Sequence, residues 1–114
     1  MPRDSRVYLE EILGAAAKIR SYVGTMGADE FLQDGKTVDA VVRNLEIIGE
    51  AVKQLPETVR AQDPGVEWQK VAGLRDILIH AYSRVDLDII WDVVANKLPD
   101  FEARARSLLD KSGG

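Results

Sequence analysis

The stretch DGKTVDAVVRNLEIIGEAVKQLP, residues 34–56, decides the fold class. Its apolar side chains recur at steps of three and four residues, the spacing that places them along one face of an α-helix. These are Val38, Val41, Val42, Leu45, Ile48, Val52 and Leu55. Asp34 or Thr37 can cap the free amides at the start of this helix, and Pro56 follows its end. The stretch therefore predicts a long amphipathic helix that buries one face.

Similar patterns lie on both sides of this stretch. Helical periodicity predicts a helix over residues 4–23, a short turn of helix over 28–33, a third long helix over 67–82 and a fourth long segment from Asp86. Pro99 lies inside the fourth segment and should kink or split it, because proline removes an amide donor and clashes with the preceding turn. We therefore expect an all-α fold, an up-and-down bundle of four main helices.

Composition sets further limits on structure and function. With 114 residues, the chain has the length of a single domain, expected over residues 1–111 with a flexible tail at 112–114. It has no cysteine and one histidine, which excludes disulfides, thiolate metal sites and a multi-histidine site within one chain. We expect neither a metal nor a cofactor. A net charge of −4, from 15 basic and 19 acidic side chains, argues against nucleic-acid binding through bulk charge but not against a local basic site.

The hydropathy pattern indicates a protein of the cytoplasm that does not enter the membrane. No apolar run approaches the roughly 18 residues that a membrane span requires. The first residues, Met1 to Asp4, do not begin an apolar segment of the kind found in a signal peptide.

The residues with the clearest chemical potential lie in the segment RDILIHAY, residues 75–82. On a helix, Arg75 and His80 are separated by roughly 140° around the axis, so their side chains converge only at a helix end or across an interface. Arg75 and Tyr82 lie on the same side, about 20° apart. Histidine moves protons near neutral pH, and arginine holds phosphate oxygens with a fixed charge. Together they suit RNA cleavage without a metal, in which imidazole takes the proton of a ribose 2′-hydroxyl.

This spacing alone is weak evidence for a catalytic site, and a purely structural role of the same residues explains it equally well. On that view His80 is a half-buried histidine satisfied by hydrogen bonds, Arg75 belongs to a surface ion pair and Tyr82 is a packed aromatic. Asp86, with Asp88 and Asp92 after it, is better explained as a helix cap than as part of a cation site.

A longer pattern around the segment resembles a known family. RDILIHAY is similar to the Arg-x-x-x-x-His-x-Tyr motif of HepT-type toxins in the HEPN superfamily. The flanks resemble that family too, in VEWQKVAGL before the motif and VDLDIIWDVV after it, residues 66–74 and 85–94. Upstream, RNLEIIGEAVKQLP, residues 43–56, resembles the signature of the family's second helix. The similarity runs in order from about Tyr8 to Leu109, over nearly the whole chain.

The resemblance implies a specific function. HepT-type proteins are homodimers that cleave RNA without a metal, with two motifs facing each other in a cleft. They are toxins paired with a minimal nucleotidyltransferase antitoxin, which silences them by transferring AMP to the motif tyrosine. Carried over, this makes Arg75 and His80 the catalytic pair and Tyr82 the AMP acceptor.

Five other residues are candidates for support or substrate binding. Asp76 stands where the family often has asparagine, and its carboxylate could weaken phosphate binding or orient Arg75. Arg43 and Glu50 lie on the second-helix signature, in a charged row that could equally be a solvated face. Lys70 and Arg84 could add positive charge to the cleft.

Two other functions remain open. The chain could be a non-catalytic helical subunit that docks to a nucleotidyltransferase or presents substrate to it. It could also be a plain dimerising module without a nucleic-acid role.

Overall fold

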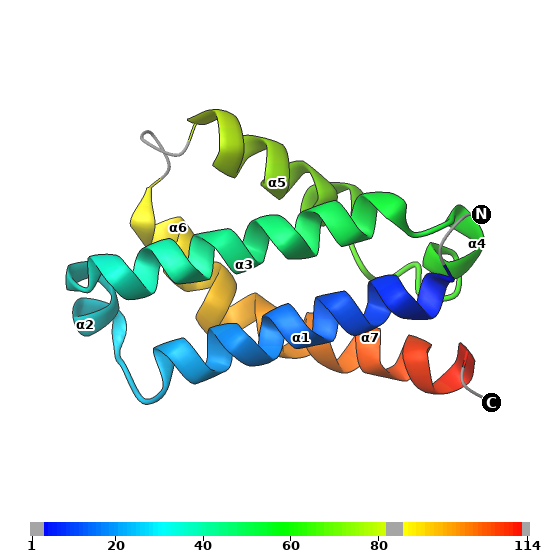
Figure 1. Ribbon diagram of the computed structural model, residues 1–114, viewed down its shortest axis with the longest axis horizontal. Coiled ribbons are helices and arrows are strands. Elements are labelled where there is room, and N and C mark those ends of the chain that lie inside the picture. Colours follow the sequence, from blue (N-terminus) through cyan, green and yellow to red (C-terminus); the bar gives the residue numbers. More distant parts are fainter. Residues whose placement is uncertain (1–3, 82–85, 113–114) are drawn as a thin grey trace.

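The computed structural model describes residues 4–81 and 86–112, without the side chains of His80 and Ala81. The described residues contain helices and no strand. In order these are α1 (Ser5–Val23), α2 (Ala28–Gln33), α3 (Gly35–Gln54), α4 (Glu57–Arg60), α5 (Trp68–Ala81), α6 (Leu87–Asp92), the π-helical turn η2 (Val93–Lys97) and α7 (Leu98–Ser112). Successive long segments run in alternating directions (Figure 1). The predicted all-α bundle is confirmed.

The helix starts follow from short-range hydrogen bonds. The side chain of Asp4 accepts from the backbone N–H of Arg6 at the start of α1. Asp34, rather than Thr37, caps α3, and its carboxylate accepts from the backbone N–H of Thr37 at 3.1 Å. Asp86 caps α6 as expected, accepting from the N–H of Asp88. Each cap satisfies an amide that the first helical turn leaves without an intrahelical partner.

The fourth segment is split as Pro99 predicts. Proline has no N–H, so it cannot complete the α-helical hydrogen bond to the carbonyl four residues earlier. In the preceding turn, the N–H of Leu98 donates to the carbonyl of Val93, five residues earlier, so the chain widens into a π-helical turn. The helix then continues through Ser112, one residue into the segment predicted to be a tail.

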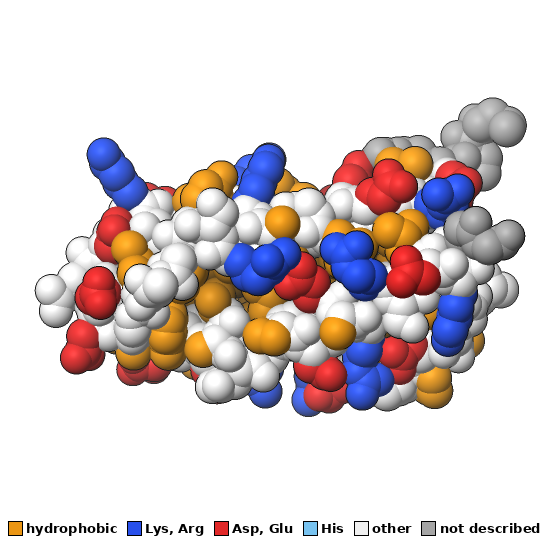
Figure 2. Space-filling view, turned by 90° about the horizontal axis from the view of Figure 1, so that it is seen from below, with side chains coloured by type: hydrophobic (Ala, Val, Ile, Leu, Met, Phe, Trp, Pro, Cys, Tyr) orange, Lys and Arg blue, Asp and Glu red, His pale blue; other side chains and the backbone are white. Residues whose placement is uncertain are grey.

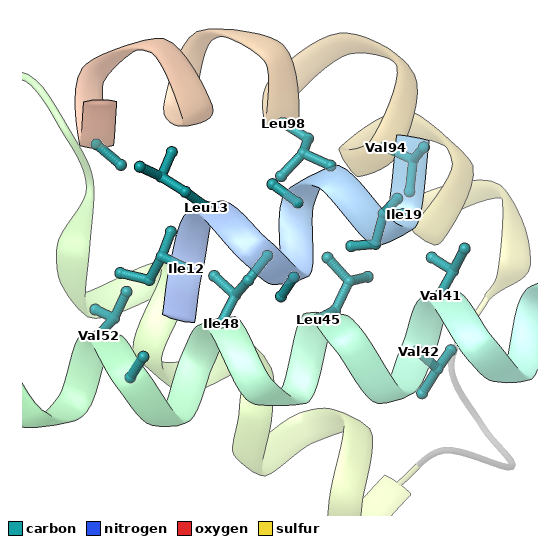
Figure 3. Packing of buried hydrophobic residues seen from close by; sticks show 14 of the residues in the cluster. Ile12, Leu13, Ile19, Val41, Val42, Leu45, Ile48, Val52, Val94 and Leu98 are labelled. Carbon is teal, nitrogen blue, oxygen red and sulfur yellow. The ribbon is translucent and has the colours of Figure 1, made fainter. Parts of the chain in front are cut away.

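The core forms where α1 packs between α3 and α7. Figure 3 shows side chains of these helices meeting across this interface, among them Ile12, Leu13, Leu45, Ile48 and Leu98. All five are buried, at most 7% exposed. The two tryptophans belong to the same apolar interior: Trp68 is buried and Trp91 packs against the core.

Helix α5 occupies a different position. It packs on the side of α3 that faces away from α1 (Figure 1). Because it has one main neighbour, its buried stripe is narrow: Leu78 is 1% exposed, whereas Ile77 and Ile79 are 54% and 44% exposed. Helical spacing of the apolar residues in this segment predicts Ile79 on the buried side together with Leu78, and for Ile79 this prediction is wrong. Helix α5 is an outer element, and its last residues, 75–81, carry all of the candidate motif except Tyr82.

Candidate active site

The candidate site begins with a close contact between α3 and α5. A methyl group on Gly49 of α3 would lie 2.5 Å from Cβ of Arg75 and 3.2 Å from the carbonyl oxygen of Val71. Real side chains essentially never approach so closely, so only glycine allows the observed helix spacing. The glycine thus brings α5 against α3 at the motif arginine.

Ion pairs then hold the Arg75 side chain in place. Its Nε lies 2.9 Å from Oε2 of Glu50, the residue after the glycine, and its Nη1 lies 3.0 Å from Oδ1 of Asp76. Lys53, one turn along α3 from Glu50, lies with its Nζ 3.7 Å from the same oxygen of Asp76. Charges therefore alternate along a row of four side chains, and the guanidinium is restrained from two sides.

Arg75 lies at the edge of a pocket of about 370 Å³ between α1, α3 and α5. The pocket is lined by residues that include Tyr8, Glu11, Arg43, Glu50, Arg75 and Ile79. Arg43 is 71% exposed and pairs with Glu46, their atoms Nη1 and Oε2 lying 3.5 Å apart. Carboxylates and guanidinium groups thus line the same pocket. Its positive charge is confined to the individual arginines and does not extend over the whole surface of the pocket.

The surface charge elsewhere is mixed. Figure 2 shows acidic and basic side chains interspersed over the face that it presents, with apolar side chains between them. A chain with a net charge of −4 has no general attraction for phosphate, so contact with phosphate relies on local basic groups.

The predicted site residues divide into three groups. Glu50 and Asp76 each contact Arg75, and Arg43 lines the same pocket as Arg75 and Glu50. Lys70 lies away from it, beside other hollows, with its Nζ 2.7 Å from Oε2 of Glu67. The remaining group comprises the side chain of His80 and the whole of Tyr82 and Arg84, which lie outside the described residues, so their roles stay predictions.

Lys70 and Glu67 affect each other's titration. The hydrogen bond from Lys70, and then its charge, lower the pKa of the Glu67 carboxyl. The same contact raises the pKa of the Lys70 ammonium. Both groups are exposed, so water and salt screen the pair.

The aspartates after the motif form no cation site in the described part of the chain. Asp86 caps α6, and Asp92 accepts from Nδ2 of Asn96 at 2.8 Å. Among the side chains that the structure describes, which do not include that of His80, no group of three metal-ligating residues lies close enough to hold an ion. Of the helices described, none combines the length and the apolar character needed to cross a membrane.

Comparison with known proteins identifies the family. The family model described as ribonuclease HepT-like matches residues 12–108. The chain belongs to this family. A protein of Methanocaldococcus jannaschii whose name designates it an RNase is 48% identical to the HepT-like chain over 101 residues, which cover 88% of this chain and 84% of that protein.

Two further relatives extend the similarity. An RNase-named protein of Caldanaerobacter subterraneus is 40% identical, with 93% of this chain and 95% of that protein covered. A protein of Thermococcus cleftensis named as a ribonuclease HepT is 38% identical, with 95% of this chain and 98% of that protein covered. No solved structure gives a significant match. The HepT-like resemblance inferred from the motifs is confirmed.

Sequence reasoning missed Gly49 and Lys53. A glycine inside a helix costs about 1 kcal/mol relative to alanine, so its presence in an otherwise regular amphipathic pattern is a signal of close approach. Nothing in the pattern tells which residue of another helix it approaches.

Because the ion pairs of Arg75 are partly exposed, we expect Arg75→Ala to change the free energy of unfolding by no more than about 1 kcal/mol. Urea unfolding monitored by circular dichroism measures this change. Arg20→Ala is the matched control, since Arg20 donates through Nε and Nη2 to Glu102 at 2.9 and 2.7 Å, between α1 and α7. A loss for Arg75→Ala far greater than for Arg20→Ala would mean that Arg75 is mainly structural.

Proposed function

We propose that this HepT-like chain is a metal-independent endoribonuclease, with Arg75 and His80 as its catalytic pair. The observation that carries the proposal is the Arg75 guanidinium, held at the edge of a pocket by Glu50 and Asp76, on the helix that leads to His80. The family and the names of three relatives support ribonuclease activity. RNA is the substrate, and the cytoplasm is where the chain would meet it.

The proposed reaction is an internal transesterification. The imidazole of His80 takes the proton of a ribose 2′-hydroxyl, whose oxygen attacks the adjacent phosphorus. Arg75 stabilises the negative charge that develops on the phosphate oxygens. The bond to the 5′-oxygen breaks, and that oxygen receives a proton as it leaves. The products are a 2′,3′-cyclic phosphate and a 5′-hydroxyl.

A second copy of the chain would supply the second histidine that one copy lacks. One histidine does not easily serve as both base and acid in a single turnover, and a homodimer brings two. The exposed side chain of Ile77, which lies within the motif on α5, supports an apolar contact with the second copy.

Regulation completes the proposal. The chain acts as the toxin of a toxin–antitoxin pair, and a minimal nucleotidyltransferase antitoxin silences it by transferring AMP to the hydroxyl of Tyr82. Membership of the HepT-like family supports this assignment.

We expect purified wild-type protein to cleave total or transfer RNA in EDTA, and His80→Ala to lose at least about 100-fold in rate, the typical worth of general acid–base catalysis. Gel analysis of the RNA measures cleavage, circular dichroism checks folding, and Arg20→Ala serves as a variant control.

Intact-mass spectrometry of the same samples separates the alternatives. Full activity of folded His80→Ala contradicts the catalytic assignment. An inactive wild type of unmodified mass favours the non-catalytic subunit that docks to a nucleotidyltransferase. An inactive wild type with added AMP mass on Tyr82 supports a silenced toxin.

The homodimer makes a separate prediction. Ile77→Glu places a charge on an apolar position that is 54% exposed, so a dimer that buries this face should dissociate to monomers. Analytical ultracentrifugation measures the change against Tyr22→Glu, at a position on α1 that is 42% exposed. An unchanged dimer in Ile77→Glu would exclude this face of α5 as the interface.

A further inference from the structure

We infer that Gly49 and Glu50 of α3 together position Arg75 for catalysis, Gly49 by setting the helix spacing and Glu50 by holding the guanidinium. This inference rests on the proposed function, because it assigns these residues a role in the same reaction. Neither residue needs to touch the substrate. Both are positioning residues that act through the arginine.

The first argument is steric. Three glycines lie inside long helices, but a methyl group on Gly14 of α1 or Gly73 of α5 would meet no atom within 4 Å. At Gly49 it would lie 2.5 Å from Cβ and 3.1 Å from the backbone nitrogen of Arg75. These atoms are fixed to the α5 backbone and cannot swing aside. A side chain at this position must therefore move α5 away from α3.

The second argument is electrostatic. Glu50 follows Gly49 on α3, and its Oε2 forms an ion pair with Nε of Arg75, 2.9 Å away. The close helix spacing lets this carboxylate reach the inner edge of the guanidinium. A guanidinium has five N–H donors, so engagement of Nε by Glu50 and of one Nη1 donor by Asp76 leaves others for a phosphate. Glu50 thereby fixes the orientation of the guanidinium and leaves other N–H groups of Arg75 able to bind a phosphate.

The two possible roles of Glu50 have opposite kinetic consequences. If Glu50 positions Arg75, its loss lets the guanidinium adopt several orientations. This lowers kcat, because a charge that is already in place before the reaction is what accelerates the chemical step. If Glu50 only adds negative charge near the phosphate, its removal strengthens RNA binding, lowers KM and leaves kcat intact. The split between kcat and KM distinguishes the roles.

We therefore propose to measure kcat and KM for a defined RNA in EDTA with Gly49→Ala, Glu50→Ala and Glu50→Gln. Gly49→Ala and Glu50→Ala should lower kcat about 10- to 100-fold with KM changed less than about 3-fold, the scale expected of a misplaced catalytic group. Glu50→Gln keeps the length of the side chain but removes the charge that pairs with Nε, so it should recover only part of the rate. Gly14→Ala and Glu102→Ala are the matched controls and should keep wild-type kinetics.

The same substitutions in the Arg75→Ala background test whether they act through the arginine. Residues that act only through Arg75 should cause no further loss once it is absent. Equal losses in both backgrounds, or an unchanged kcat with a lower KM in Glu50→Ala, would overturn the inference. Glu50→Ala removes only a half-exposed carboxylate and should fold. It therefore tests the positioning role even if Gly49→Ala does not fold.

Failure of the proposed function would look different. Full cleavage by Arg75→Ala would overturn the catalytic role of the arginine. The Arg75 Nε–H signal in nuclear magnetic resonance spectra still tests the contact itself: it should be protected from solvent exchange in wild type and lose that protection in Glu50→Ala. Equal protection in both proteins would show that Glu50 does not hold Arg75.

Discussion

Helix α3 has to pack against a different helix on each of two faces, and the position of the candidate site depends on how it does so. Toward α1 it presents branched apolar side chains such as Val41, Leu45 and Ile48, all buried. Toward α5 it presents Gly49, where the two backbones approach too closely for any side chain. The face toward α1 forms part of the core. The face toward α5 places Arg75 beside a pocket that residues of α1 and α3 also line.

The charges around that contact explain how an acidic chain can present a usable positive group. Glu50 and Asp76 neutralise much of the field of Arg75, yet they also hold it at 2.9 and 3.0 Å from defined atoms. Exposed pairs of this kind contribute little to stability. Their value lies in restricting a long side chain that would otherwise sample many rotamers, and this restriction is what catalysis by a fixed charge requires.

Much of the fold could be predicted from the sequence, because helix positions depend on local periodicity and on caps such as Asp34 and Asp86. The interruption at Pro99 was also predictable, but the π-helical turn before it was not, since several local hydrogen-bond arrangements can accommodate a missing N–H. Ile79 was placed on the buried side because periodicity cannot tell how many neighbours cover a helix. The motif identified Arg75, whereas the Gly49 contact joins residues 26 positions apart in the chain and needs the tertiary structure.

The chemistry of the RNA ends is the most direct test of the mechanism centred on Arg75 and His80. Attack by the 2′-hydroxyl predicts that wild-type protein in EDTA produces fragments with 2′,3′-cyclic phosphate and 5′-hydroxyl ends, detectable by mass spectrometry of a short defined RNA. Fragments with 3′-hydroxyl and 5′-phosphate ends would mean that water attacks the phosphorus instead, and would contradict this mechanism.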